Sequence, residues 1–234
     1  MISAFITNLG KYNEGELCGE YLNLPATTED VKALLSRIGV DGVIYEEIFI
    51  TDYETKINGL NNLGEYENIG ELNYLASLLA DMDKYDLERF EAAAAFDDNN
   101  YSVKNLINLT QNLDNFDFYP DVHDYDDLGR YLIYECGFIN LSDQVEPYFD
   151  YQAYGRDFAD SETCKFINGG FMWQCYNEFE EFYDGYDIPD EYRIFSYPDP
   201  VEKMPMKQQL DMFSKMAAVH SETSKLAPSH EDRI

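Results

Sequence analysis

The residues best able to do chemistry in this 234-residue chain are carboxylates, since it has 46 Asp and Glu but only three His and four Cys. The acidic run nearest to a calcium-binding pattern is 121–127, with carboxylates at its first, fourth, sixth and seventh positions. A calcium-binding loop arranges oxygen ligands around a glycine that makes its sharp turn, and this run has no glycine. We therefore expect no metal site, and we interpret the run as the acidic start of a helix, where Asp meets the positive end of the dipole.

Acid–base catalysis by paired carboxylates is a weak hypothesis for this chain. With 46 acids some pair is inevitable, and catalysis needs one carboxylate whose pKa is raised in an apolar pocket. The three histidines, His123, His220 and His230, are too far apart in sequence to suggest a triad or a metal cluster. Neither a G-x-S-x-G nucleophile motif nor a phosphate-binding glycine loop is present. We therefore predict that the protein is not an enzyme and takes no cofactor.

The cysteines and the hydropathy pattern indicate a cytoplasmic protein. Cys18, Cys136, Cys164 and Cys175 are widely separated and form no C-x-x-C pair, which favours free thiols in a reducing compartment. The N-terminus has neither a basic region nor a long apolar one, and no later stretch approaches 18 apolar residues. We therefore expect neither secretion nor a membrane-spanning segment.

The net charge of −30 is the most unusual property of the sequence. High net charge often accompanies disorder, but here 45% of the residues are hydrophobic and 15% aromatic, which is enough for a packed core. A surface this negative repels nucleic acid and anionic lipid, so we expect basic protein partners and neither a nucleic-acid nor a membrane partner.

The charge is concentrated before residue 199. That part holds 40 of the 46 acids and 11 of the 16 bases, a net of −29, whereas the tail is nearly neutral and contains Met204, Met206, Met212 and Met216. At duplex spacing, 29 charges correspond to roughly 50 Å of DNA. A compact molecule of this mass would spread them over roughly 11,000 Å², far more thinly than a duplex does. An imitation of DNA would therefore need an elongated body or acids on one track.

Local patterns predict a small sheet and a helix in the first segment. Residues 3–8 and 17–24 read as strands joined by a loop, and residues 43–51 as a β-rich run. Between them, Thr27 or Thr28 can cap a helix whose apolar residues fall at helical spacing.

The middle segment reads as helical. Asn68 and Glu71 resemble a capping box that starts a helix from residue 69 to 82. A second helix is predicted over residues 85–96, and a third one starts at Ser102.

The third segment returns to mixed α and β structure. A strand is expected at residues 116–119 and a strand pair at 165–174, with a helix capped by Asp124 or Asp126 and another capped by Ser142. Residues 178–186 follow no pattern that we can assign, and residues 206–217 suggest one amphipathic helix.

Several stretches together resemble the ArdA antirestriction proteins. They are ITNLGKYNEGELCGEYLNLP at 6–25, ITDYE at 50–54, IGELNYLASLLADMDKYDLERFEAAAA at 69–95, DLGRYLIYECG at 127–137 and VEPYFDYQAYGRDF at 145–158. The resemblance covers about the first three quarters of the chain, in the family's order. Its most specific part includes Asp150, Tyr151, Tyr154, Gly155, Arg156 and Asp157.

The resemblance implies an α+β fold, elongated, with three small domains in a row. We expect a sheet with a helix in residues 1–60, a helical domain in 61–112, a sheet with helices in 113–175, and a C-terminal extension in 176–234. It also implies a homodimer formed through the third domain. The family's antirestriction motif, near that contact, would include Asp126, Asp127, Leu128, Gly129, Tyr131, Leu132, Glu135 and Gly137.

The function implied by the resemblance is inhibition of type I restriction–modification enzymes through mimicry of bent B-form DNA, which protects mobile-element or phage DNA from host defence. Ten acids would stand in for phosphates: Asp81, Asp83, Asp86, Glu88, Glu91, Asp121, Asp124, Asp126, Asp127 and Glu135. The alternative is a generic acidic interaction protein that binds basic nucleoid-associated partners. The two hypotheses differ in selectivity, because a polyanion would act on basic proteins indiscriminately.

Overall fold

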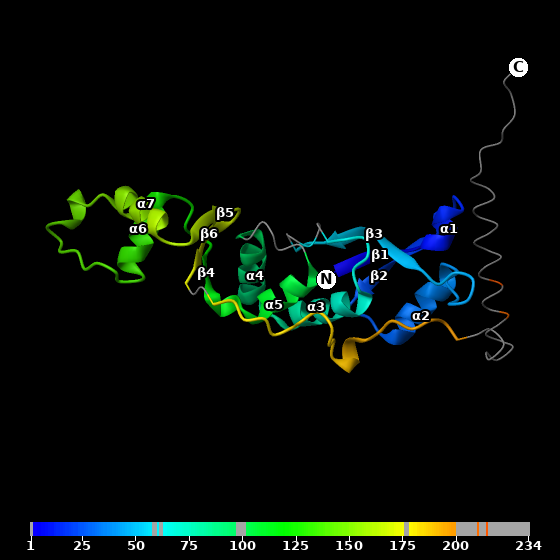
Figure 1. Cartoon of the computed structure of the whole chain (residues 1–234). Helices are drawn as coiled ribbons and strands as arrows, with labels where there is room; N and C mark the ends of the chain where they lie inside the picture. The colour runs from blue at the N-terminus through cyan, green and yellow to red at the C-terminus, as the bar shows by residue number, and fades with distance from the viewer. Residues whose placement is uncertain are drawn as a thin grey trace, which may run out of the picture.

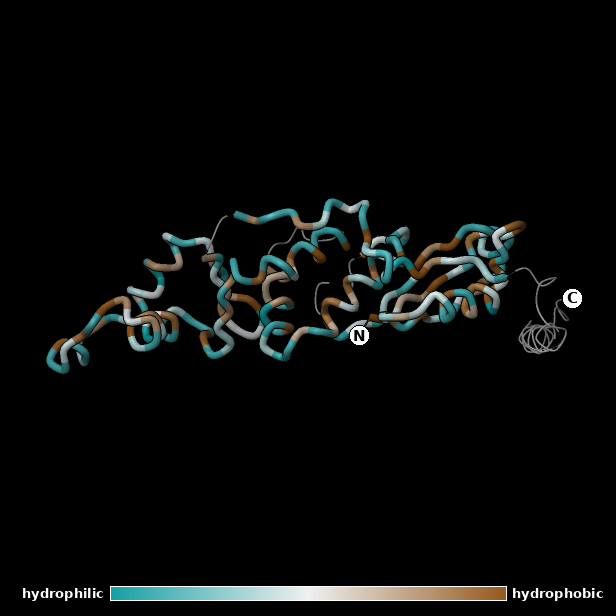
Figure 2. The backbone as a smooth tube through the Cα atoms, turned by 90° about the horizontal axis from the view of Figure 1, so that it is seen from below, coloured by the Kyte–Doolittle hydropathy of each residue, from teal (hydrophilic) through white to brown (hydrophobic). Residues whose placement is uncertain are grey.

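The computed structural model describes residues 2–57, 60, 63–96, 102–175 and 178–199, together with Leu210 and Ser214. The described elements follow one another along an elongated α+β body (Figures 1 and 2). Helices α6 and α7 lie at one end and α1 and α2 near the other, with two small sheets and helices α3 to α5 between them (Figure 1).

The first sheet has three antiparallel strands in the order β2-β1-β3. They are β1 (Ile2–Asn8), β2 (Gly19–Leu24) and β3 (Ile48–Thr55). Helix α2 (Thr28–Arg37) begins with the predicted cap, because the Thr27 side chain accepts a hydrogen bond from the Asp30 backbone N–H. Its buried residues Val31, Leu34 and Leu35 belong to the same core as the sheet.

Two predictions for this segment are wrong in detail. The expected loop after β1 holds a short helix, α1 (Leu9–Asn13), because the Asn8 side chain accepts a bond from the Lys11 backbone N–H at 3.0 Å. The β-rich run at 43–51 becomes strand only from Ile48. Before it, the Asp41 carboxylate accepts three backbone N–H groups, at distances of 2.8 to 3.1 Å, and holds a turn.

The three predicted central helices are confirmed. They are α3 (Ile69–Asp81), α4 (Lys84–Phe96) and α5 (Val103–Gln111). Asn68 caps α3 by accepting bonds from the backbone N–H groups of Gly70 and Glu71. Ser102 caps α5 in the same way.

The second sheet is also antiparallel, in the order β4-β6-β5. Its strands are β4 (Phe116–Tyr119), β5 (Cys164–Ile167) and β6 (Gly170–Gln174), preceded by the 3-10 helix η2 (Leu113–Asn115). Helices α6 (Tyr125–Tyr134) and α7 (Tyr151–Ser161) pack against each other beside it.

The helix predicted to start at Ser142 is wrong. Residues 142–150 contain only the 3-10 helix η3 (Glu146–Tyr148), and Val145 and Tyr148 are exposed rather than inward-facing. Pro147 would fall in the interior of the predicted helix, where it lacks the N–H that the helix requires. The helix begins instead after Asp150, whose carboxylate accepts the Ala153 backbone N–H at 3.0 Å.

The buried residues form two clusters. The main one is continuous from the first sheet through α2 and α3 to α5, and reaches Phe116, Phe118 and Met172. The second contains Val122, Leu128, Leu132 and Phe171. Since the first two predicted domains share one core, the arrangement of three separate domains in a row is not confirmed. The boundaries at 60, 112 and 175 remain a prediction.

Residues 178–199 turn back from β6 and run along the central helices towards α2 (Figure 1, yellow to orange). They include one 3-10 helix, η4 (Asp190–Tyr192). The amphipathic helix predicted at 206–217 lies outside the described residues, except for Leu210 and Ser214, which both have helical backbone. In the described part of the chain, no helix has the length and apolar character needed to cross a membrane.

Helices α6 and α7 cross at two glycines. A Cβ added to Gly129 would lie 2.0 Å from the carbonyl oxygen of Tyr151, and one added to Gly155 would lie 2.1 Å from the carbonyl oxygen of Tyr125. Both neighbours are backbone atoms, which a rotamer change cannot move. The backbones can therefore approach this closely only because both positions are glycine.

The crossing predicts that Gly155→Ala destabilises the protein. The added methyl group must push the helices apart, and overpacking of this kind costs about 1–3 kcal/mol. A loss of about 2–4 °C in Tm per kcal/mol is expected for a domain of this size, measured by thermal unfolding. Gly64→Ala is the matched control, because its new Cβ would meet only the Glu67 side chain. Equal Tm values for the two variants would contradict a tight crossing.

Candidate functional site

The first group of candidate acids lies where α3 ends and α4 begins. Asp81 and Asp83 are exposed, and Asp86, Glu88 and Glu91 follow on α4 with partial exposure. The Asp83 carboxylate accepts the Asp86 backbone N–H at 2.9 Å, which fixes the start of α4. This carboxylate therefore supports the helix as well as charging the surface.

Two bases partly neutralise this first group. Arg89 lies 2.9 Å from Asp86 and also 3.5 Å from Asp114, and Lys84 lies 3.3 Å from Glu88. The pKa of Glu91 is raised, first by burial and then by the neighbouring Glu88 charge. By contrast, no hydrogen bond or ion pair within the described residues engages the Asp81 carboxylate.

The second group of acids surrounds the start of α6. The Asp124 carboxylate accepts the Asp127 backbone N–H at 2.9 Å, and the Asp127 carboxylate accepts that of His123 at 3.2 Å. These reciprocal bonds confirm the interpretation of the run 121–127 as an acidic helix start. No cluster of His, Cys, Asp and Glu that could hold a metal ion occurs among the described residues.

The remaining acids of the second group differ in their availability. Asp126 pairs with Arg130 at 2.7 Å. Asp121 and Glu135 are exposed, and across the described ranges neither carboxylate takes part in a hydrogen bond or an ion pair. Together with Asp81, they are the acids of the predicted set that are fully available to a partner.

The fold places the second sheet between the helices α4 and α6, which carry members of the two groups of acids (Figure 1). Helix α4 contacts all three strands of the second sheet, and α6 lies beyond that sheet (Figure 1). The pKa of the Tyr131 phenol on α6 is raised by burial first, and also by nearby groups that include Glu135 and Tyr85 of α4. The second sheet therefore links the helices that carry the two groups, although some 40 residues separate the groups in sequence.

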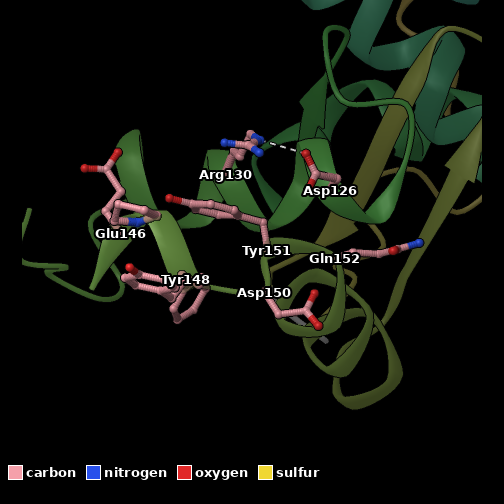
Figure 3. Close-up of a pocket in the computed structure, with 9 residues that line it drawn as sticks. Asp126, Arg130, Glu146, Tyr148, Asp150, Tyr151 and Gln152 are labelled. Atoms are coloured by element: carbon pink, nitrogen blue, oxygen red, sulfur yellow. Dashed lines mark hydrogen bonds and ion pairs between the residues drawn. The ribbon is translucent and has the colours of Figure 1, made fainter. Parts of the chain in front are cut away.

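A pocket of about 620 Å³ opens beside α6 and α7 (Figure 3). The Arg130 guanidinium lies over the Tyr151 ring, 4.1 Å from its centroid, and is paired with Asp126. The Tyr134 hydroxyl lies 2.5 Å from the Glu146 carboxylate and 2.6 Å from the Tyr151 hydroxyl. These contacts hold the segment before α7 against α6. The charged and aromatic side chains around the pocket therefore have a structural role.

The predicted antirestriction motif is partly internal. Leu128 and Leu132 are buried in the second cluster, and Tyr131 packs against Tyr119 with ring centroids 4.3 Å apart. Glu135 and Gly137 are exposed at the end of α6. Only part of the motif can therefore touch another molecule.

The residues that carry the resemblance at 150–157 are mainly structural. Asp150 caps α7, Gly155 lies at the helix crossing, and Tyr154 packs near the second cluster. Arg156 and Asp157 are exposed and lie 3.8 Å apart.

Sequence reasoning missed one set of surface acids, on the segment 178–199 that it left unassigned. The exposed members are Glu178, Glu180, Glu181, Asp184, Asp187, Asp190, Glu191 and Asp199. A signal for their placement was present in α5 and just beyond it, where asparagines at 108, 112 and 115 follow helical spacing.

The hydrogen bonds of the Tyr134 hydroxyl predict a local effect of Tyr134→Phe. The change removes the hydroxyl shared by Glu146 and Tyr151, so residues 139–149 should be cleaved several-fold faster in limited proteolysis while Tm falls little. Tyr148→Phe is the control, because that side chain is 88% exposed. Identical cleavage of both variants and the parent would show that the hydroxyl does not hold this segment.

Comparison with known families finds a match over most of the chain. A model of the family described as antirestriction protein (ArdA) matches residues 4–173, which run from β1 to β6. A search of curated proteins finds no match. The family match covers well over half of the chain and contains both groups of candidate acids. The chain therefore belongs to the ArdA antirestriction protein family.

Proposed function

We propose that this protein inhibits type I restriction–modification enzymes by occupying their DNA-binding groove in place of B-form DNA, and so protects incoming mobile-element or phage DNA. Family membership supports the antirestriction function and the class of target. One observation supports the mimicry most directly. The first 198 residues have a net charge of −29, and their described part forms an elongated body (Figure 1).

The mechanism is occupancy without chemistry. A groove that binds DNA holds Lys and Arg side chains that neutralise phosphates and release their counterions. Carboxylates on a folded body can pair with the same cations. Because Asp83, Asp124 and Asp127 also cap helices, their positions are fixed before the partner arrives. Such preorganisation lowers the entropy lost on binding.

We also propose that the protein acts as a homodimer joined at the α6–α7 end. Several large apolar side chains are exposed there, as others, among them Val43 and Ile44, are elsewhere in the described chain. Those at the α6–α7 end are Tyr134, Phe138, Val145 and Tyr148. An end-to-end pair would double the length of the charged body, and would present Glu135 near the join.

The alternative function, a generic acidic protein for basic nucleoid-associated partners, is distinguished by selectivity. A DNA mimic should inhibit a purified type I enzyme at a near-stoichiometric ratio, and added cognate DNA should compete with it. An unrelated basic protein should bind far more weakly at the same salt concentration. Equal binding to both would favour the polyanion hypothesis.

If the protein mimics DNA, inhibition should be lost gradually as more of its acidic side chains are neutralised. Asp81→Asn, Asp121→Asn and Glu135→Gln should each weaken inhibition less than about fivefold, since exposed charge pairs contribute about 0.2–1 kcal/mol. The triple variant should lose roughly threefold to 150-fold, because distant sites add. The measurement is inhibition of the purified enzyme over a range of inhibitor concentrations.

The matched control keeps the charges and changes only side-chain length. Asp81→Glu, Asp121→Glu and Glu135→Asp together should leave inhibition nearly unchanged. If one of the neutral single variants abolished inhibition while Tm and oligomeric state stayed the same, the distributed mechanism would be wrong.

A further inference from the structure

Three asparagines lie in a row on one face of α5 and η2. Asn108, Asn112 and Asn115 are spaced by four and three residues, which places them on the same side of a helix. Asn108 is 1% exposed and Asn112 is 5% exposed. Burying an amide is costly unless its hydrogen bonds are made, so each needs a partner.

The partners are main-chain groups of the segment 178–183. The Asn108 Nδ2 group donates to the Tyr183 carbonyl at 2.8 Å, and its Oδ1 accepts the Tyr183 N–H at 2.8 Å. Asn112 pairs with Glu180 in the same way, at 2.8 and 2.9 Å.

The row ends with Asn115, whose Nδ2 donates to the Glu178 carbonyl at 2.9 Å. A carboxamide offers a donor and an acceptor side by side, so it binds the main chain of an extended peptide as a neighbouring strand would. The asparagine row is therefore built to bind extended main chain.

Beyond Tyr183 the same segment becomes part of the core. The Tyr183 hydroxyl donates to Glu71 of α3 at 2.7 Å, and the Tyr192 ring stacks on Tyr74 of α3 with centroids 4.7 Å apart. Ile194 is 3% exposed within the main cluster. The segment is thus anchored to two of the central helices.

The far end of the segment contacts α2 and the loop that precedes β3. The Tyr197 hydroxyl donates to the Glu46 carbonyl at 3.0 Å, and its ring covers Gly42, where a Cβ would lie 2.7 Å away. Asp199 lies 3.7 Å from Lys32 of α2. One stretch of 22 residues, 178–199, therefore spans the molecule from the edge of the second sheet to α2.

Charge alone does not explain this docking. The segment carries eight of the exposed acids and lies on a body that is itself strongly negative, so the long-range force between them is repulsive. Lys104 pairs with Glu181, and Arg193 pairs within the segment with Asp187 and Asp190. Neutral main-chain hydrogen bonds and apolar burial must supply the rest.

We propose that the asparagine row is an intramolecular peptide-binding site, and that residues 178–199 are its occupant, a brace that holds the second sheet, the central helices and the first sheet at fixed spacing. The brace lies beyond residues 4–173, the part that the family match covers. Only its consequence for inhibition, a fixed spacing of the acids, rests on the proposed function.

Hydrogen–deuterium exchange of the full chain tests the brace. In the double variant Asn108→Ala/Asn112→Ala, the amides of residues 178–199 should exchange at least roughly tenfold faster, because four hydrogen bonds are lost. Peptides from β1 and α3 should keep their exchange rates. Asn105→Ala is the matched control, since Asn105 is exposed on the same helix. Unchanged exchange at 178–199 in the double variant would overturn the brace.

A second variant covers the case in which the double variant unfolds. Tyr197→Ala removes a 39% exposed side chain at the far end, so the core should survive. Faster proteolytic cleavage confined to the last residues of the segment, up to Asp199, supports the brace. Unchanged cleavage there would overturn it.

The effect of salt concentration distinguishes binding through main-chain hydrogen bonds from binding through ion pairs. In the parent chain, protection of residues 178–199 should persist or increase at 0.5 M NaCl, because screening weakens the repulsion between the segment and the body. Loss of protection would show that ion pairs hold the segment, and would overturn the role of the asparagine row.

Inhibition assays keep the two proposals separate. The double variant should inhibit the type I enzyme several-fold more weakly than Asn105→Ala. If the parent chain fails to inhibit the enzyme, the proposed function is wrong, and the exchange results still decide the brace.

Discussion

The repulsion among some 29 net negative charges is the constraint on which the rest of this structure depends. It opposes every compact arrangement of the chain, and it is weakest when the charges lie far apart. The body is accordingly elongated (Figure 1), and the side chains that it buries in the described residues are apolar or neutral. The buried polar residues are Thr7, Asn8, Asn73, Asn108 and Asn112.

Buried asparagine side chains, which are neutral, therefore connect neighbouring helices, strands and segments. Ion pairs could have made the same connections in a less acidic protein. Asn8 donates to the Ile38 carbonyl at 3.2 Å and ties the end of β1 to the end of α2. Asn73 accepts the Ala26 backbone N–H at 2.8 Å and ties α3 to the segment before α2. Asn108 and Asn112 do the same for the brace. These bonds do not depend on the surface charge, so carboxylates such as Asp81, Asp121 and Glu135 need not join the parts of the fold.

Local signals in the sequence predicted most of the elements, and non-local contacts explain the failures. The caps at Thr27, Asn68, Ser102 and Asp124 act within four residues, so the sequence around them suffices. Residues 178–186 have no readable pattern, because Asn108 and Asn112 bind their main chain and place no demand on their side chains. The acids of the candidate site were predicted as a set. Which of them stay free depends on where Arg89, Arg130 and Lys84 lie in the fold.

At the α6–α7 end, the stretch 150–157 that carries the most specific resemblance lies apart from the free acids of the proposed inhibitory surface. Asp150 caps a helix, Tyr151 lies under Arg130, and Gly155 permits the helix crossing, so the recognisable stretch specifies how this end folds. The free acids Asp121 and Glu135 flank α6 without any bond that requires an acid there. A mimic that works by many weak contacts needs charge in approximately the right places more than it needs particular residues. The stretch 150–157 therefore identifies the scaffold, and under the proposed mimicry the distribution of charge over it would set the affinity for a basic groove.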